Sequence, residues 1–186
     1  MSATTLRVGD PEAMHELGVS LGRRLAAGDL VILTGPLGAG KTTLTRGIGE
    51  GLGVRGPVQS PTFVLARTHP SLGDGAPLVH VDAYRLGEAA ELEDLDLDFD
   101  GSVVVAEWGS GLVGARDSWI EVVIERPVGG AAGAGAAGVG TAGAGTAGGE
   151  PAEEDWDEED WAEEPVEART VTVAGHGPRW ADGVLG

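Results

Sequence analysis

Short apolar runs alternate with segments rich in glycine, proline and acidic residues over the first 126 residues of the chain. Residues 29–34 (DLVILT) and 103–106 (VVVA) are almost continuously apolar, which is typical of strands buried on both faces of a parallel sheet. Further strands are expected at residues 6–8, 62–66, 78–84, 119–124 and 168–174. Residues 73–75 (GDG) have turn chemistry and separate two of these strands.

Helical periodicity lies between the predicted strands. Residues 10–12 (DPE) have the features of a helix start, with proline near the first turn and acidic side chains at the positive end of the helix dipole. Apolar residues then recur at i, i+4 spacing, which predicts an amphipathic helix ending at Gly28. Its apolar face comprises Ala13, Leu17, Leu21 and Leu25. A second helix is expected over residues 42–52 and a short acidic one over 88–95.

Residues 127–167 differ in composition from the rest of the chain. The segment begins almost entirely with Gly, Ala, Val, Thr and Pro and continues with acidic residues around two tryptophans. Side chains this small bury too little apolar surface to offset the entropy of ordering the chain. We therefore expect a single domain formed by residues 1–126 and 168–186, interrupted by a disordered insertion. The tryptophans are compatible with anchoring a partner, but their acidic surroundings favour a solvated segment.

Charge and composition narrow the possible functions. The formal net charge is −18, and eleven acidic residues but no basic residue lie within 127–167, so the rest of the chain carries −7. An acidic body does not favour direct binding to DNA or RNA, because phosphate contacts need a basic face. The chain has no cysteine, no signal-peptide pattern and no apolar run long enough to cross a membrane. We therefore expect a cytoplasmic protein without a membrane contact.

Residues 35–42 (GPLGAGKT) match the Walker A pattern G-x-x-x-x-G-K-[ST] at every fixed position. Lys41 is the only lysine, and all eleven other basic residues are arginines. A strand before the loop and a helix after it would point backbone N–H groups and the helix N-terminus at an anion. Glycine matches arise easily in a chain with 33 glycines, but a Lys-Thr pair in this context does not. The expected nucleotide contacts are Gly35, Gly38, Ala39, Gly40, Lys41, Thr42 and Thr43.

The loop and the alternating elements together predict the fold class. We expect a P-loop NTPase-like three-layer α/β/α fold with a mostly parallel central sheet and an antiparallel C-terminal hairpin. The chain has no asparagine, so the Asn-Lys-x-Asp motif that reads guanine is absent. The expected nucleotide is therefore ATP.

A P-loop enzyme also needs metal ligands and groups that act on the attacking water. Thr42 would supply a hydroxyl to Mg²⁺, and Glu107 follows a buried strand directly, where a Walker B acid is expected; the alternative is a glutamate facing water. Asp82 ends another strand and is equally compatible with a catalytic role and with a cap or salt bridge. Thr62 is compatible with a switch that senses the γ-phosphate, although taken alone it resembles an ordinary turn residue.

Several blocks of sequence, in this order, resemble the TsaE family, the bacterial ATPases of tRNA threonylcarbamoyladenosine synthesis. The blocks are residues 35–47 (GPLGAGKTTLTRG), 60–63 (SPTF), 80–86 (HVDAYRL) and 107–108 (EW), and 177–180 (GPRW) fits some members. The resemblance extends over about residues 5–126 and 168–181. Pro36 stands where many members have Asp, and the 127–167 segment is absent from typical members.

The resemblance implies an ATPase subunit that works with two proteins, TsaB and TsaD. TsaD would transfer a threonylcarbamoyl group to adenosine 37 of tRNAs that read codons beginning with A, and ATP hydrolysis would reset the complex between turnovers. The tRNA would be bound by the partners. By the same resemblance, Lys41 binds phosphate and Thr42 and Glu107 hold Mg²⁺. Asp82 would serve hydrolysis, Thr62 would lie in the switch-like loop, and Glu12 would touch the nucleotide.

Two alternatives remain open at this stage. The first is a small-molecule P-loop kinase, which would need arginines around an acceptor substrate; the nearby candidates are Arg46, Arg55, Arg67 and Arg85. The second is a nucleotide-gated interaction module without fast turnover, in which Thr62 and Trp108 report bound ATP to a partner. The sequence does not decide whether Asp82 or Glu107 orients the attacking water.

Overall fold

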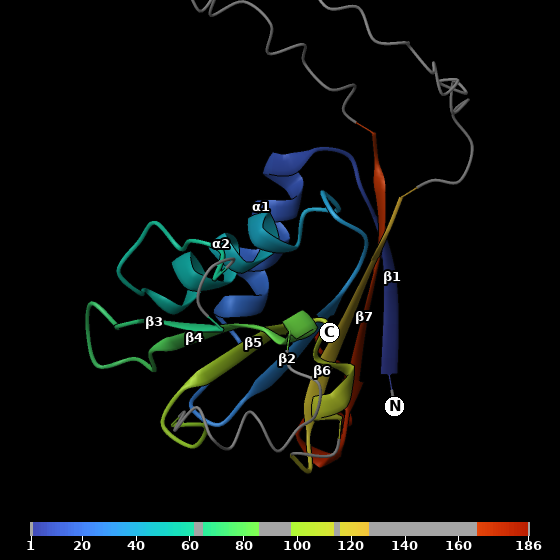
Figure 1. Cartoon of the computed structure of the whole chain (residues 1–186). Helices are drawn as coiled ribbons and strands as arrows, with labels where there is room; N and C mark the ends of the chain where they lie inside the picture. Colours follow the sequence, from blue (N-terminus) through green and yellow to red (C-terminus); the bar gives the residue numbers. More distant parts are fainter. Residues whose placement is uncertain (1, 62–64, 86–97, 114–115, 127–166, 186) are drawn as a thin grey trace, which may run out of the picture.

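The computed structural model describes residues 2–61, 65–85, 98–113, 116–126 and 167–185. A seven-stranded sheet runs through them in the order β1-β7-β6-β2-β5-β4-β3 (Figure 1). The strands are β1 (Ser2–Val8), β2 (Leu30–Thr34), β3 (Ala66–His69), β4 (Leu78–Asp82), β5 (Val103–Glu107), β6 (Trp119–Glu125) and β7 (Arg169–His176). The α-helices are α1 (Pro11–Gly22) and α2 (Lys41–Leu52).

The centre of the sheet is parallel and its margins are antiparallel. Strands β6, β2, β5 and β4 run in the same direction, whereas β1-β7-β6 and β4-β3 pair antiparallel. All five residues of β5 are buried, as expected for a strand between two neighbours in the parallel centre. In β6, by contrast, buried residues alternate with partly exposed ones. The expected α/β class, the parallel centre and the C-terminal hairpin are confirmed.

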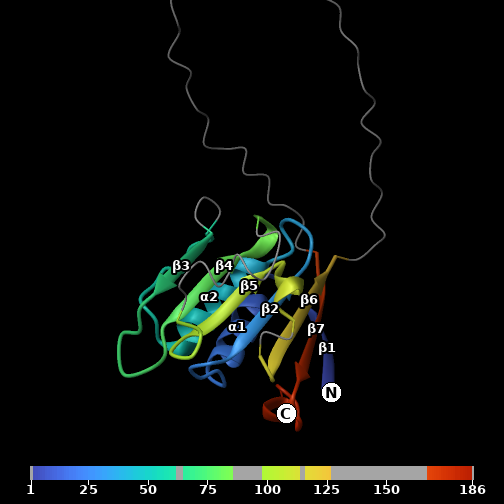
Figure 2. The same ribbon diagram turned by 60° about the horizontal axis from the view of Figure 1, so that its bottom comes forward.

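Two apolar clusters cover the two faces of the sheet. The larger joins α1 and α2 to side chains such as Val31, Val105 and Val122, so both helices lie over the same face (Figure 2). The smaller lies on the opposite face and includes Ile32 and Val104, the neighbours of those side chains along the strands. The period of two along a strand explains this division. The carboxyl ends of β2, β4 and β5 lie together at one edge of the sheet, and α2 begins at the same edge.

Helices α1 and α2 approach each other through glycines. A Cβ atom on Gly18 would lie 2.3 Å from the carbonyl oxygen of Leu44, and one on Gly47 would lie 2.1 Å from that of His15. These distances are shorter than any real Cβ contact, so the helix pair requires hydrogen in place of a side chain at both positions. The close approach positions α2, and with it the Walker A lysine at its first residue.

The structure corrects the predicted face and end of the first helix. Asp10 caps α1 by accepting a hydrogen bond from the Ala13 N–H, as the start pattern predicted, but the helix ends at Gly22 and not at Gly28. The buried residues are Met14, Gly18, Leu21 and Gly22. Of the predicted face, Leu21 is buried within the helix and Leu25 is buried after it, while Ala13 and Leu17 are partly buried. The i, i+4 rule missed the glycines because they carry no apolar signal.

The predicted strand 62–66 is corrected at its last two residues, while residues 62–64 lie outside the described residues. Ala66 is the first residue of β3, which continues to His69, and Leu65 lies in a bend. Pairing with β4 rather than local apolarity determines this strand, because Ala66 to His69 align with Val81 to Leu78. The remaining strand predictions agree with β1, β2, β4, β5, β6 and β7 to within a few residues at their ends. The predicted helix 88–95 and insertion 127–167 lie outside the described residues, apart from Glu167.

The C-terminal segment returns to the body of the domain. The 3₁₀ helix Pro178–Trp180 follows β7, and Trp180 is buried in the larger cluster. Arg179 forms a two-pronged ion pair with Asp29, with Nε 2.5 Å from Oδ1 and Nη2 2.7 Å from Oδ2. This pair connects the end of the chain to the turn before β2. None of the described helices is long and apolar enough to cross a membrane.

Candidate nucleotide-binding site

The loop between β2 and α2 has the backbone of an anion cradle. Gly38 and Gly40 adopt left-handed conformations with φ of 71° and 106°. Gly40 is the N-cap of α2 and provides no side chain to cap the helix. The first N–H groups of α2 are therefore available to an anion at the positive end of the helix dipole. Arg126, just after β6, supports the loop from outside by donating from Nη2 to the Gly38 carbonyl oxygen at 3.1 Å.

Lys41 points back into this loop. Its Nζ donates to the carbonyl oxygens of Gly35 at 2.9 Å and Pro36 at 3.2 Å, and it lies 4.5 Å from the ring centroid of Trp108. The side chain is only 6% exposed. Burial lowers the pKa of Lys41 from its ordinary value of 10.5, while the negative charges of Glu107 and, to a smaller extent, Asp82 act in the opposite direction. The ammonium is thus held at the place where the motif puts phosphate.

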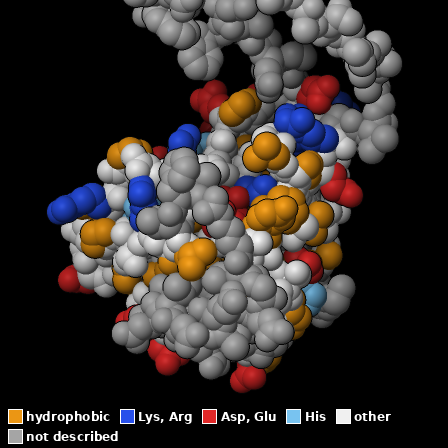
Figure 3. All heavy atoms as spheres, in the orientation of Figure 1, with side chains coloured by type: hydrophobic (Ala, Val, Ile, Leu, Met, Phe, Trp, Pro, Cys, Tyr) orange, Lys and Arg blue, Asp and Glu red, His pale blue; other side chains and the backbone are white. Residues whose placement is uncertain are grey.

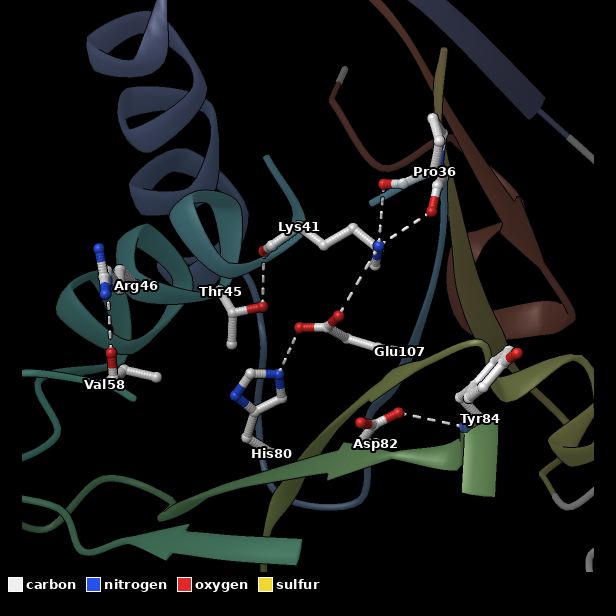
Figure 4. A network of polar contacts seen from close by, with 10 residues as sticks. Pro36, Lys41, Thr45, Arg46, Val58, His80, Asp82, Tyr84 and Glu107 are labelled. Atoms are coloured by element: carbon white, nitrogen blue, oxygen red, sulfur yellow. Dashed lines mark hydrogen bonds and ion pairs between the residues drawn. The ribbon is translucent and has the colours of Figure 1, made fainter. Parts of the chain in front are cut away.

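Glu107, the last residue of β5, lies opposite Lys41 (Figure 4). Its Oε2 atom is 3.8 Å from Lys41 Nζ, and its Oε1 atom is 3.0 Å from Nε2 of His80. The Glu107 side chain is 11% exposed and His80 is fully buried. A buried carboxylate needs charged or hydrogen-bonding partners, and these two residues provide them. The alternative of a strand-end glutamate facing water is therefore wrong.

Asp82 ends β4 next to Glu107. The two residues are register partners in the parallel pair of β4 and β5. Asp82 Oδ1 accepts a hydrogen bond from the backbone N–H of Tyr84 at 3.2 Å, a local capping contact. Its side chain is partly exposed and lines the same cavity as Glu107. Asp82 is therefore both a cap and a member of the site, so the structural and functional interpretations are compatible.

A cavity of about 780 Å³ connects these groups. It is lined by Leu37, Gly38, Ala39, Gly40, Lys41, Thr42, Thr43, Ser60, Asp82, Tyr84, Glu107 and Trp108. Two aromatic rings stand at one side, since the Tyr84 and Trp108 rings meet edge to face with centroids 5.9 Å apart. Figure 3 shows that basic, acidic and hydrophobic side chains are interspersed on the visible face rather than sorted into one basic patch. This face thus differs from the basic face that direct nucleic-acid binding needs.

The structure brings most of the predicted site residues together. Six of the seven predicted loop contacts line the cavity, and the seventh, Gly35, accepts the hydrogen bond from Lys41. Asp82 and Glu107 join them from the neighbouring strands. Glu12 lies exposed in the first turn of α1 and is not among the lining residues. Thr62 lies outside the described residues, although Ser60 of the same block lines the cavity.

The residues present fit a magnesium ion that binds together with phosphate. The described ranges contain no group of three or more His, Asp or Glu side chains that could hold a metal alone. Mg²⁺ is usually held by one or two carboxylates together with substrate phosphates and water. Thr42 and Glu107, both lining the cavity, match that smaller set of ligands. The expected metal residues therefore remain the best candidates.

Trp108 has a structural role at the site that the sequence did not predict. It is the only described non-glycine residue with positive φ, at 61°, and its N–H donates to the Leu33 carbonyl oxygen at 2.8 Å. This conformation turns the chain directly after β5 and lays the indole against Lys41. Tyr84 likewise had no assigned role, whereas His80, the partner of Glu107, was expected to be buried beside the site, and this is confirmed. The signal in the sequence that could have indicated the role of Trp108 is an aromatic residue directly after Glu107, the acid that ends β5.

Comparisons with known proteins extend over most of the chain. A family model described as "Threonylcarbamoyl adenosine biosynthesis protein TsaE" matches residues 8–128. A Streptomyces coelicolor protein named tRNA threonylcarbamoyladenosine biosynthesis protein TsaE is 51% identical over 172 residues, which cover 90% of this chain and 94% of that protein. A Mycobacterium tuberculosis protein of the same name is 52% identical over 120 residues, covering 60% of this chain and 70% of its own.

A solved structure gives the same result for the fold. The crystal structure of Bacillus subtilis YdiB is similar with a TM-score of 0.58 and 25% sequence identity, and the match covers 95% of this chain and 87% of that one. The family model alone matches more than half of the chain. The chain therefore belongs to the TsaE family, whose members are named for their part in the biosynthesis of threonylcarbamoyladenosine in tRNA.

Proposed function

We propose that this chain binds ATP with Mg²⁺ and hydrolyses it as a subunit that works with TsaB and TsaD in the threonylcarbamoylation of adenosine 37 of tRNAs reading codons that begin with A. Hydrolysis resets the complex between turnovers. The observation that carries the proposal is the arrangement of Lys41 and Glu107, which face each other at 3.8 Å inside a glycine cradle at the start of α2.

Each group has a role that follows from its position. The N–H groups at the start of α2 and the Lys41 ammonium bind the phosphate oxygens, because both are positive and converge on the loop. Thr42 and Glu107 hold Mg²⁺, which when bound neutralises charge on the phosphates. Asp82 lies beside Glu107 and forms no ion pair within 4 Å among the described residues, although its charge acts on Lys41 at longer range, and this suits it to orient the attacking water.

The lining of the cavity favours an ATPase over a small-molecule kinase. Lys41 is the only basic residue among the described residues that line it. Arg46 and Arg67, two arginines considered for an acceptor site, instead contact Val58 and Gln59. A kinase for an anionic acceptor would need further positive charge there. Water as the acceptor needs none, so hydrolysis fits the lining better.

The acidic charge supports an indirect role toward RNA. The whole chain carries −18, and the part outside residues 127–167 carries −7. A domain with this negative charge repels a polyanion such as RNA at distances up to the Debye length. TsaB and TsaD would therefore hold the tRNA, and this chain would contribute ATP turnover to the assembly.

The test is multiple-turnover threonylcarbamoylation of tRNA by the cognate TsaB and TsaD proteins. The chain is left out, added as wild type, or added as Lys41→Ala, with Arg55→Ala as a control for an exposed basic residue outside the cavity lining. We expect repeated turnovers with wild type and the control, and a stop near one turnover with Lys41→Ala. Equal yields in all reactions would contradict the proposal, and ATP hydrolysis only with an added small acceptor would favour the kinase.

A further inference from the structure

His80 occupies an unusual position for a polar side chain. It is the middle residue of β4, within the run Leu78-Val79-His80-Val81, and its side chain is fully buried. Its register partners are Arg67 on β3 and Val105 on β5. An imidazole in such a strand loses its hydration and needs a hydrogen-bond partner in the protein. An apolar residue would fill this position in the core without the free-energy cost of burying a polar group. The presence of a histidine here therefore indicates a role other than packing.

The partner of His80 is the carboxylate of Glu107. Nε2 of His80 lies 3.0 Å from Oε1, while Oε2 lies 3.8 Å from the ammonium of Lys41 (Figure 4). A carboxylate only accepts hydrogen bonds, so Nε2 carries the proton in this contact. Nδ1 of His80 has no hydrogen-bond partner among the described residues. The contact to Glu107 is thus the polar interaction that the buried ring makes within that part of the chain.

We propose that His80 is a positioning residue that holds the Glu107 carboxylate with Oε2 turned toward Lys41 and the cavity. The inference rests on the proposed ATPase function and assigns one residue within it. A glutamate has rotatable side-chain bonds, and catalysis at a phosphate and metal site depends on fixed geometry. Hydrogen bonds to a ligating carboxylate fix its direction, and losing such a bond typically costs about 10- to 100-fold in metal affinity or activity.

The alternation along the two strands makes this geometry possible. His80 and Asp82 lie on the same face of β4, two residues apart, and Glu107 lies on the neighbouring strand in register with Asp82. His80 therefore reaches the Glu107 side chain from the interior, one step below the cavity. It does not line the cavity itself and so acts on the chemistry through Glu107.

Two substitutions and a matched control separate positioning from packing. His80→Leu removes the donor and keeps a buried apolar side chain, whereas His80→Gln keeps an amide N–H at similar reach. His69→Leu is the control, because His69 is another buried histidine, on adjacent β3, whose Nε2 has no hydrogen-bond partner among the described residues and which does not line the cavity. The full chain is assayed with its partner proteins for kcat and KM for ATP. Calorimetry measures the affinity of the protein for ADP, once in the presence of Mg²⁺ and once with a chelator that removes it.

We expect His80→Leu to lower kcat by about 10- to 100-fold with little change in KM. It should also reduce the gain in ADP affinity that Mg²⁺ provides. His80→Gln should recover most of both losses, and His69→Leu should match wild type. In a Glu107→Gln background, His80→Leu should cause no further loss of kcat.

The inference is overturned if His80→Leu keeps the kcat and Mg²⁺ response of wild type. It is also overturned if His80→Gln and His80→Leu lose activity equally, or if the loss persists undiminished in the Glu107→Gln background. If His80→Leu does not fold, the His80→Gln variant decides, because it must then retain activity and Mg²⁺ response. An inactive wild-type complex would instead contradict the proposed function itself.

Discussion

Asp82 and Glu107 are register partners at the ends of two parallel strands, yet their carboxylates have different surroundings. Glu107 is held between His80 and Lys41, whereas Asp82 accepts only the local hydrogen bond from the Tyr84 N–H among the described contacts. A carboxylate fixed between two partners suits a metal, and one with open lone pairs suits a water molecule. This difference supports the proposed assignment of Glu107 to the metal and of Asp82 to the attacking water, and the second of these is the choice that the sequence left open.

The first prediction concerns Glu107→Gln. The change removes a negative charge 3.8 Å from the Lys41 ammonium and leaves the loop intact, so ATP binding should be retained. Turnover should fall by about 100-fold or more, because a metal ion stabilises transition-state charge by several kcal/mol and Glu107 is assigned to hold it. Calorimetry with ADP and a phosphate-release assay in the complete complex measure the two quantities. Loss of binding together with turnover would show that Glu107 is structural.

The second prediction follows from the lowered pKa of Lys41. Burial is the largest cause of the shift, so the folded protein releases this proton below the ordinary lysine value of 10.5. Phosphate binding needs the charged ammonium, and affinity for ADP should therefore decline as pH rises toward 10.5, before an ordinary lysine would titrate. The decline should be absent in Lys41→Arg, whose guanidinium stays charged. Calorimetry across this range checks it, and parallel declines in both proteins would contradict the assignment.

The same shift has a consequence for stability. The unfolded chain binds the Lys41 proton more tightly than the folded chain, so between the lowered pKa and 10.5 this residue makes stability rise with pH. Below the lowered pKa, Lys41 is charged in the folded protein, and the full cost of burying that charge reduces the free energy of unfolding. In urea denaturation at alkaline pH, Lys41→Met should lack this rise relative to wild type. An unchanged slope would contradict the pKa shift independently of nucleotide binding.

The third prediction concerns the glycine contact between the helices. Gly47→Ala places a methyl group where the nearest atom is the His15 carbonyl oxygen at 2.1 Å, so the helices must separate. Overpacking of this kind costs about 1–3 kcal/mol. Since α2 begins at Lys41, ADP affinity should fall as well. The control is Gly9→Ala, because a Cβ at Gly9 would meet nothing within 4 Å. Equal urea midpoints for the two variants would refute the tight contact.

The fourth prediction concerns the ion pair of Arg179 with Asp29. The Asp29 side chain is 6% exposed, so Arg179→Ala leaves a buried carboxylate that keeps the hydrogen bond from the Ala26 N–H but loses its guanidinium partner. We expect a loss of about 2 kcal/mol in the free energy of unfolding. Arg116→Ala is the matched control, because its partner Asp100 is 90% exposed and such surface pairs contribute about 0–1 kcal/mol. Chemical denaturation checks both, and equal losses would mean that burial of the acceptor does not matter.

Local patterns in the sequence were enough to locate most elements. Continuous apolar runs at β2 and β5 and the Walker A loop between β2 and α2 agree with the structure almost residue by residue. The extension of β3 from Ala66 to His69 was missed, because it depends on pairing with β4 rather than on local apolarity. The face of α1 was partly missed because it packs through Gly18, a residue without hydrophobic signal.

The candidate site likewise has one part that local sequence determines and another that depends on tertiary structure. A motif is a local property, since backbone N–H groups of consecutive residues form the cradle, and so the sequence by itself determined the loop and its lysine. The relation between Lys41, His80 and Glu107 is not local, because these residues come from α2, β4 and β5. Only strand order and register bring Glu107 within 3.0 Å of His80 and 3.8 Å of Lys41. Tertiary structure therefore decided that Glu107 is buried and held by His80, and that Trp108 covers the lysine.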